Sequence, residues 1–342
     1  MMGCERGWSR RSNTHRFRRK TRPGTGIYVR MGDSMKIFMT GGTGFVGAYF
    51  AERFAQTGHE VVIVTRSAAT RRSFPGGTTL VEGNPMAPGR WQERVAGCDA
   101  VINLAGESIF NRWSPEMRQS ILDSRVLTTR RVVEALADSG GKSTLISASA
   151  VGYYGSNTGD ALVDETSPSG DGFLVRVAKE WEREATEAEH FGARVVLCRF
   201  GVVFGGGGGA LVKMAPPFRY GLGSAIGDGR QWFPWIHQED LFNIMLFLLE
   251  HGEIDGPLNC TAPYPVRNEE LTRELANALN RPLIAPHIPA FLVKTLLGEF
   301  GDVFLKGQRA VPRRLMEKGF HFRFPTIQEA MGDLLSRMGA AA

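Results

Sequence analysis

The sequence lacks long apolar runs and is poor in cysteine. None of its apolar segments approaches the ~18 residues of a membrane-spanning helix. The four cysteines, Cys4, Cys98, Cys198 and Cys260, are far apart and show no spacing typical of a metal site or a redox motif. Three of them lie in apolar, strand-like runs, so we expect buried, reduced thiols. These features predict a cytoplasmic protein with no metal and no membrane partner.

The first 34 residues contain few acidic side chains. They hold nine Lys or Arg against only Glu5 and Asp33, whereas the rest of the chain is nearly balanced, so the net charge of +6 belongs to this segment. It has no apolar core typical of a secretory signal. It could be a nucleic-acid-binding arm, a transit-like segment, or a stretch before the true start, because Met31 and Met35 precede the first strand. We expect a disordered, functionless tail over residues 1–34, without a nucleic-acid partner.

A glycine-rich turn lies between two apolar runs in residues 35–66. The order of segments predicts strand, glycine turn, amphipathic helix and second strand. Such a unit holds a dinucleotide, because its glycines allow a tight turn, let main-chain N–H groups reach the pyrophosphate and let the helix pack on the strand. The N-terminus of the helix adds unpaired donors and a partial positive charge. The predicted cofactor contacts in this unit are Gly41, Gly44, Phe45, Val46 and Gly47.

The second strand of this unit ends without an acidic residue. A carboxylate there would bind the ribose 2′-hydroxyl of NAD, but this chain has Arg66, between Thr65 and Ser67. A guanidinium can pair with a 2′-phosphate and stack on adenine, so we predict NADP rather than NAD. The alternative is a solvated loop arginine.

Short apolar strands alternate with helical segments as far as Phe200. This alternation predicts an α/β fold with a doubly wound parallel sheet of the Rossmann type. Ser114, Pro115 and Glu116 together form a typical helix start. After the glycine unit, the expected strands cover residues 78–81, 100–104, 144–147 and 194–200, and the expected helices cover 91–96, 114–137 and 172–191.

The pattern changes after Phe200. Residues 205–209 are five consecutive glycines, which favour a linker or a mobile hinge over a regular element. Further helices are expected at 239–250, at 268–279 and after Pro325. We therefore predict a nucleotide-binding domain over residues 35–204 and a smaller α+β substrate domain over 205–342, from which a strand near 257–260 returns to the sheet.

Several short strings resemble the extended short-chain dehydrogenases/reductases. The similarity is greatest to a branch of epimerase-like proteins, the cell-division-inhibitor-related epimerases, which end in a domain of unknown function, here about 286–335. The likeness runs from Met35 to about Leu335 and leaves out the tail. The strings that carry it are TGGTGFVG (40–47), NLAGE (103–107), RW (112–113), SRV (124–126), SAVGYYG (149–155) and GRQWFPWIH (229–237).

The resemblance implies a nicotinamide dinucleotide and an acid–base site. Active members of the superfamily use a serine after the fifth strand and Tyr-x-x-x-Lys on the next helix. Ser149 matches the serine, Lys179 is the only lysine on that helix, and Val175 stands where the tyrosine is expected. Valine cannot transfer a proton, so the usual chemistry is absent or another residue supplies it. The cofactor contacts implied after the fourth strand are Asn103, Ala105 and Gly106.

Other residues could supply the proton. The candidates are Tyr153, Tyr154, Glu107 and His237. Tyr154 matches a tyrosine that many epimerases carry in the substrate pocket, and with Ser149 and Lys179 it completes our candidate catalytic set. The alternatives are aromatic packing for Tyr154, a solvated loop carboxylate for Glu107, and for His237 a structural histidine before a helix that Asp240 helps to cap.

Three more side chains allow two interpretations. Trp232 and Trp235 could line a substrate pocket or belong to the core. We expect one of the two to lie in the core and the other at the rim of the pocket. Arg125 is expected to be a structural ion-pair residue.

The sequence thus supports two functions. The first is an NADP(H)-dependent oxidoreductase or epimerase acting on a small carbonyl or sugar-nucleotide compound, with the hydride chemistry supplied by the cofactor. The alternative is a non-catalytic NADP(H)-binding regulator, whose occupancy sets a partner-binding surface. Val175 favours the second function, whereas Ser149 and Lys179 favour the first. The substrate and the oligomeric state stay open.

Overall fold

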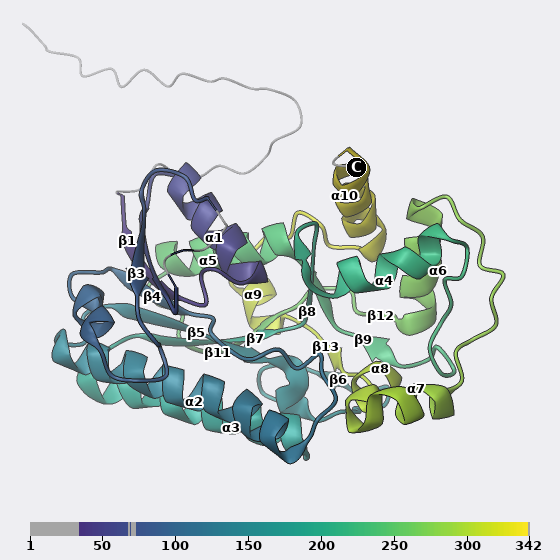
Figure 1. The fold of residues 1–342 in the computed structure, drawn as a ribbon, viewed down its shortest axis with the longest axis horizontal. Coiled ribbons are helices and arrows are strands. Elements are labelled where there is room, and N and C mark those ends of the chain that lie inside the picture. Colours follow the sequence, from purple (N-terminus) through teal and green to yellow (C-terminus); the bar gives the residue numbers. More distant parts are fainter. Residues whose placement is uncertain (1–33, 68, 70–72, 341–342) are drawn as a thin grey trace, which may run out of the picture. The chain divides into compact units, whose positions relative to one another are not determined.

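A parallel sheet of seven strands organises the chain (Figure 1). The computed structural model describes residues 34–67, 69 and 73–340, so the predicted tail lies outside the described residues except for Ser34. The strand order across the sheet is β11-β7-β5-β4-β1-β2-β3. The strands are β1 Lys36–Thr40, β2 Glu60–Thr65, β3 Thr78–Glu82, β4 Ala100–Asn103, β5 Thr144–Ala150, β7 Val195–Phe200 and β11 Gly256–Cys260.

The chain enters the sheet in the middle and winds outward in both directions. From β1 it moves to β2 and β3 on one side, and then to β4, β5, β7 and β11 on the other. Ligands of such sheets bind at the carboxyl ends of the strands where the order reverses, here between β1 and β4. The prediction of a Rossmann-type α/β fold is confirmed. The strand expected near residues 257–260 is β11, which pairs with β7.

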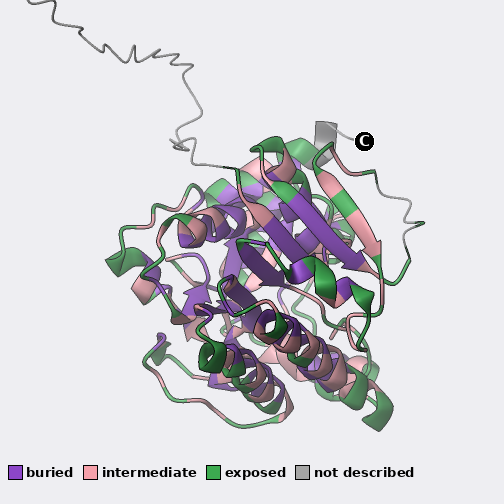
Figure 2. Ribbon diagram, turned by 90° about the vertical axis from the view of Figure 1, so that its left-hand side faces the viewer, coloured by how far each residue is buried: buried purple, intermediate pink, exposed green. Residues whose placement is uncertain are grey.

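Helices cover both faces of the sheet (Figures 1 and 2). Strand β1 shows how its sequence specifies two cores. Ile37 and Met39 join the core that contains Phe50 of one helix and Phe242 of another, whereas Phe38 joins the core on the opposite face. Side chains of a strand alternate between its faces, so an unbroken apolar run fills both cores. The main covering helices are α1 Phe45–Gln56 and α5 Gln238–Glu250 on one face, and α2 Pro115–Asp138 and α3 Phe173–Thr186 on the other.

Helix α2 begins where the sequence predicts. The hydroxyl oxygen of Ser114 accepts a hydrogen bond from the main-chain N–H of Met117 at 3.2 Å, and Pro115 occupies the first turn, where its missing N–H costs nothing. The expected short helix at 91–96 is a 3₁₀ segment, Arg90–Val95. The helix expected over 172–191 is α3 followed by a second 3₁₀ segment, Glu187–Phe191.

A smaller C-terminal region follows β7. It has its own core, in which Phe204, Trp235 and Leu271 pack with residues of the last helix, including Met331 and Leu334. The glycine run is more regular than expected, because Gly205 ends a strand and Gly209 begins a helix. The division into two domains at residue 204 stays a prediction. The remaining elements are β6 Leu162–Val163, β8 Val202–Gly205, α4 Gly209–Arg219, β9 Trp232–Phe233, β10 Trp235–His237, β12 Val266–Arg267, α6 Asn268–Ala278, α7 Ala290–Leu297, α8 Asp302–Leu305, β13 Arg309–Ala310, α9 Arg313–Glu317 and α10 Ile327–Ala340, with 3₁₀ segments Val151–Tyr154 and Gly298–Gly301.

The described cysteines match the expectation from the sequence. Cys98, Cys198 and Cys260 are buried free thiols, and Cys4 lies outside the described residues. Among the helices that the structure describes, none has the length and apolar character needed to cross a bilayer.

Candidate cofactor and catalytic site

The glycine loop between β1 and α1 is shaped by close contacts that only glycine permits. Gly41 has a φ of +66°, and a Cβ there would lie 2.7 Å from the main chain of Leu104. A Cβ on Gly47 would overlap the carbonyl oxygen of Gly41. At Gly44 the one non-neighbouring atom of the described residues that a Cβ would meet within 4 Å is that same oxygen, at 3.2 Å. The loop is therefore pressed against β4 on one side and open at Gly44 on the other.

The start of α1 suits an anionic group. Gly44 is its N-cap residue and provides no side-chain cap. The first N–H groups of a helix have no partner within the helix, so those of Phe45, Val46 and Gly47 can donate to a phosphate. The loop thus fits a dinucleotide pyrophosphate in both shape and charge.

Asn103 holds the ends of β1 and β4 together from within the sheet. Its amide oxygen accepts from the hydroxyl of Thr40 at 2.7 Å, and its amide nitrogen donates to Thr129 and Ser147 at 2.8 and 3.2 Å. The Thr40 oxygen in turn accepts from the main-chain N–H of Ala105. Asn103 is completely buried. It therefore positions the segment that contains Ala105 and Gly106, and its own side chain faces the interior.

Arg66 lies at the expected place. It directly follows β2, is exposed, and makes no hydrogen bond or ion pair within the described part of the chain. The guanidinium is thus available to a ligand at the edge of the glycine loop.

Arg125 has a role that its sequence context does not indicate. The expected ion pair is wrong: its Nη1 donates to the main-chain oxygens of Ile121 and Glu107 at 2.9 and 3.1 Å, and it has no carboxylate partner among the described residues. Its guanidinium lies 5.2 Å from the ring centre of Trp181 and directly beneath Gly106. Burial lowers the pKa of Arg125 to about 10. A cation held against the loop after β4, with no carboxylate at ion-pair distance among the described residues, is a further candidate for contact with an anionic ligand.

The sheet register places three polar side chains side by side on neighbouring strands. Ser149 of β5 is opposite Arg199 of β7, which is opposite Asn259 of β11. Glu182 of α3 accepts the Ser149 hydroxyl at 2.6 Å and two bonds from the Arg199 guanidinium at 2.8 Å each. The hydroxyl of Tyr154 donates to Asn259 at 2.8 Å and accepts from Arg199 at 3.0 Å. All five side chains are buried, and we call them the polar row.

Ser149 and Tyr154, which the resemblance assigns to catalysis, both form hydrogen bonds within the polar row. The Ser149 hydroxyl is committed to a carboxylate rather than free for a substrate oxygen. Tyr154 has both its donor and an acceptor position filled, and burial raises its pKa to about 12, against the lowering effect of Arg199. A tyrosine in this state is a poor proton donor near neutral pH.

Lys179 is not brought to Ser149. The face of α3 that meets the sheet carries Ala178 and Glu182, whereas Lys179 is exposed and lines a surface hollow of about 420 Å³ together with Arg176 and Arg183. One residue along a helix turns the side chain by about 100°, which separates Lys179 from its buried neighbour Ala178. Val175 is buried at the position where the tyrosine was expected, so helix α3 brings neither a tyrosine nor a lysine to the serine.

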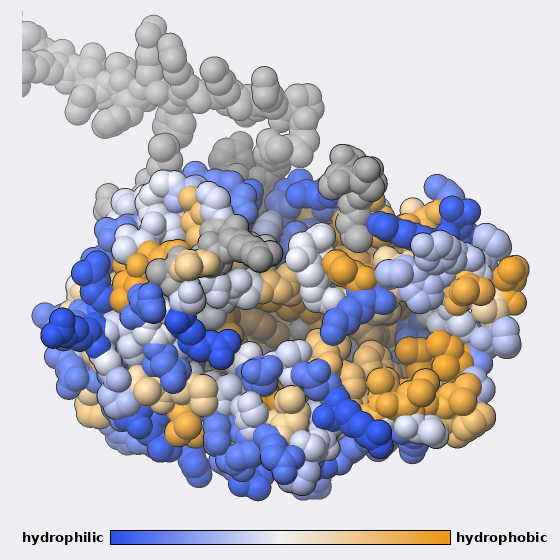
Figure 3. All heavy atoms as spheres, in the orientation of Figure 1, coloured by the Kyte–Doolittle hydropathy of each residue, from blue (hydrophilic) through white to orange (hydrophobic). Residues whose placement is uncertain are grey.

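The C-terminal region approaches the start of α1 through the glycine run. A Cβ on Gly208 or Gly209 would lie 2.8 or 2.5 Å from the ring of Phe45, so these glycines permit the close approach. Beside the ring is a cavity of about 180 Å³, which Tyr49 and Gln238 also line. Figure 3 shows a hollow near the middle of the face in view, with hydrophobic atoms at its bottom.

Two models of known protein families match this chain. A model of the NAD dependent epimerase/dehydratase family matches residues 37–260, from β1 to β11. The chain belongs to this family. A second model, a domain of unknown function called DUF1731, matches residues 288–334. The family and its branch, suggested by the short strings, are confirmed.

The similar proteins share this architecture over most of their length. The "Epimerase family protein SDR39U1 homolog, chloroplastic" of Arabidopsis thaliana is 39% identical over 92% of each chain. The "Epimerase family protein YfhF" of Bacillus subtilis is 37% identical over 88% of this chain and 98% of its own. Among solved structures, the human epimerase family protein SDR39U1 with NADPH is 32% identical, with a TM-score of 0.77, over 88% of this chain and 99% of that one.

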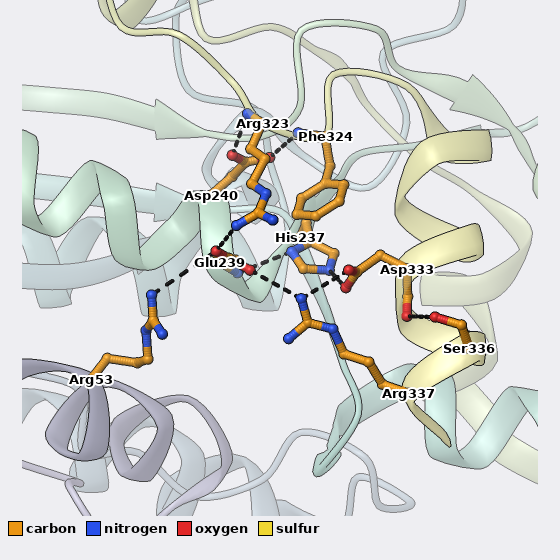
Figure 4. Close-up of polar contacts among 9 residues, drawn as sticks. All are labelled: Arg53, His237, Glu239, Asp240, Arg323, Phe324, Asp333, Ser336 and Arg337. Atoms are coloured by element: carbon orange, nitrogen blue, oxygen red, sulfur yellow. Dashed lines mark hydrogen bonds and ion pairs between the residues drawn. The ribbon is translucent and has the colours of Figure 1, made fainter. Parts of the chain in front are cut away.

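His237 of this epimerase-family chain is a buried structural residue (Figure 4). Its Nδ1 accepts from the main-chain N–H of Glu239 at 3.1 Å, and its Nε2 lies 3.3 Å from a carboxylate oxygen of Asp333. Burial lowers its pKa to about 4, although Asp333 acts in the opposite direction. His237 itself caps α5. The expected capping role of Asp240 is wrong, because its carboxylate accepts from the main-chain N–H groups of residues 323 and 324.

The two tryptophans differ in burial. Trp235 is completely buried in the C-terminal core. Trp232 is half-buried between the guanidinium groups of Arg267 and Arg309, at 4.5 and 4.6 Å from its ring centre, and its Nε1 donates to Asp160. Trp235 is therefore the core residue of the pair, and a role of Trp232 at the rim of a pocket stays a prediction.

Proposed function

We propose that the chain binds NADP(H) and exchanges a hydride with a small carbonyl or sugar-nucleotide compound, as an oxidoreductase or an epimerase. The observation that carries the cofactor choice is Arg66, an exposed cation at the end of β2, with no ion-pair partner in the described part of the chain, where NAD-selective folds place a carboxylate. The glycine loop and the start of α1 would hold the pyrophosphate, and the main chain at Ala105 and Gly106 would border the nicotinamide end. The bound cofactor supplies the hydride, and the protein orients it. The NADPH of the human relative supports this choice.

Substitution of Arg66 tests the cofactor preference. Arg66→Ala should weaken NADPH binding by ~1–3 kcal/mol, the range for a hydrogen bond to a charged group, and leave NADH binding nearly unchanged. Arg90→Ala removes another exposed arginine and is the matched control, measured by isothermal titration calorimetry. Equal losses for NADPH and NADH would contradict the proposal.

Tyr153 is the best remaining proton donor. Tyr154 and His237 are buried and hydrogen-bonded, and the Glu107 carboxylate accepts from the N–H of Ser108. Tyr153 is half-buried, its ring lies 3.5 Å from the guanidinium carbon of Arg199, and its hydroxyl has no partner among the described residues. In a carbonyl library, Tyr153→Phe should slow NADPH oxidation at least ~100-fold, the usual contribution of acid–base catalysis. Equal rates would eliminate Tyr153.

The polar row favours a second candidate function, an NADP(H)-binding regulator without turnover. The Ser149 hydroxyl is already occupied by Glu182, and Lys179 faces solvent. NADPH that binds tightly but is not oxidised by any compound of a broad carbonyl panel would support the regulator.

The reducing, cytoplasmic setting also stays a proposal, supported by the three buried free thiols.

A further inference from the structure

Six large apolar side chains of the C-terminal region are exposed on one part of the surface. We call them the apolar patch: Leu222, Ile284, Ile288, Phe291, Leu292 and Leu296, with exposed fractions from 39% to 76%. Thirteen large apolar side chains are exposed in the described residues, so nearly half of them gather here. Contiguous exposed apolar surface of this kind marks an interaction site.

Hydrogen bonds hold the two segments of the patch side by side. The N–H of Ile288 donates to Ala225, which lies three residues after Leu222, and the N–H of Gly227 donates back to Ile288, both at 2.9 Å. Helix α7 follows directly and exposes Phe291, Leu292 and Leu296 within one arc of its surface, while only Val293 is buried. Figure 3 shows hydrophobic atoms gathered on this side, over α7 and the chain before it.

The charged side chains within the two segments that carry the patch have one sign. Residues 209–222 and 281–297 contain Lys213, Arg219, Arg281 and Lys294 and no acidic residue, and the acids Asp228, Glu299 and Asp302 follow just beyond them. Only Lys294 has a carboxylate near it, Asp302 at 3.9 Å. The rest of the described chain carries more acidic than basic residues. Two copies meeting through this surface would bring like charges together, whereas an anionic partner would be complementary.

We propose that the apolar patch docks on the surface of an anionic lipid bilayer. Phe291 and Leu296 are 66% and 72% exposed, so they protrude from the molecule instead of lining a groove for a protein segment. Protruding apolar side chains enter the boundary between headgroups and acyl chains, and flanking cations attract anionic headgroups. The expectation of no membrane partner rested on the lack of a spanning segment, and this mode of binding needs none. It is independent of the proposed function.

Vesicle sedimentation of the full chain tests the proposal. With vesicles of phosphatidylcholine plus phosphatidylglycerol the chain should sediment, and with phosphatidylcholine alone it should bind much less. The double variant Phe291→Ser/Leu296→Ser should partition at least ~10-fold more weakly, because buried apolar area drives insertion. Leu162→Ser/Met316→Ser, at residues 53% and 51% exposed outside the patch, is the matched control and should bind like the parent. NADPH-induced thermal stabilisation of each variant verifies its fold.

A local probe separates the patch from the basic tail, which could bind anionic vesicles by charge alone. In a Cys4→Ser background the remaining cysteines are buried, so Leu296→Cys or Leu162→Cys can carry an environment-sensitive dye. Vesicles should shift the emission of the dye to the blue at position 296 and not at 162. Sedimentation without a shift at 296 would assign binding to the tail and overturn the proposal. The proposal would also be overturned if the chain did not bind vesicles. A lower molecular mass of the double variant than of the parent in sedimentation velocity would overturn it as well, because that result would identify an interface between copies.

Discussion

Two neighbouring parts of the strand-end edge are built in opposite ways. Between β1 and β4 the surface is main chain, shaped by Gly41, Gly44 and Gly47, and its contacts require the absence of side chains. At β5, β7 and β11 the polar row fills the edge with side chains whose polar groups bond one another. The first part leaves donors available to a ligand, whereas the second has committed its groups internally. Cofactor binding and catalysis are therefore separable in this chain, and substitutions can test that separation.

The largest effect is expected from Glu182→Gln. The substitution leaves the Arg199 guanidinium buried without its anion, and breaking a buried ion pair costs about 3–5 kcal/mol. Urea unfolding should show this loss, while NADPH affinity of the folded fraction stays unchanged. Glu180→Gln, on the same helix with an exposed Arg176 partner, should cost less than about 1 kcal/mol. A large loss of NADPH affinity in Glu182→Gln would show that the two parts act as one site.

Gly47→Ala should have the reverse effect. The new Cβ would overlap the Gly41 carbonyl oxygen, so the loop must shift away from its pyrophosphate geometry. We expect NADPH binding to weaken about 100-fold, or about 2.7 kcal/mol, in calorimetric titration. Gly76→Ala is the control, because its added Cβ meets no atom within 4 Å among the described residues that are not its chain neighbours. Unchanged affinity in Gly47→Ala would disprove the assignment of the loop.

A smaller effect concerns pH and the contact between α5 and α10. His237 has a folded-state pKa of about 4, lower than its ordinary value near 6.5, so its contribution is complete above pH 6.5 and is lost as pH falls toward 4. The contribution of His237 by itself to the free energy of unfolding should fall by up to about 1.4 kcal/mol per pH unit within that window. Asp333, Arg337 and Arg323 face this ring, and Asp240, whose pKa burial raises to about 6, contributes with the opposite sign.

His237→Asn isolates this contribution. Asparagine keeps a capping oxygen for α5 but does not titrate in this range. The variant should lose less stability than the parent between pH 6.5 and 5 in urea unfolding. Parallel pH curves for the two proteins would contradict the prediction.

The smallest effect is expected from Lys179→Met. Because Lys179 is exposed and unpaired among the described residues, the change should alter stability and NADPH affinity by less than about 0.5 kcal/mol. A strong loss of turnover with any substrate would place Lys179 in the reaction and weaken the contrast between the two parts of the edge.

Patterns local in sequence were predictable. The glycine turn, the Ser114 cap and the apolar runs are each contained within about ten consecutive residues. The fold, the family and the position of Arg66 could be predicted from these patterns. The candidate catalytic set was less predictable. Lys179 was chosen because it is the only lysine on its helix, but a one-residue difference in register turns it to solvent. Nothing near Arg125 in the sequence indicates that its partners are main-chain oxygens.

The amino-acid sequence by itself determined the order of strands and helices, the doubly wound sheet and the dinucleotide loop, because these depend on side-chain periodicity and on where side chains are missing. The pairing of Ser149 with Glu182, of Arg199 with Tyr154 and of His237 with Asp333 was decided by the tertiary structure. Such partners are far apart along the chain, and only strand register and helix packing bring them within hydrogen-bonding distance.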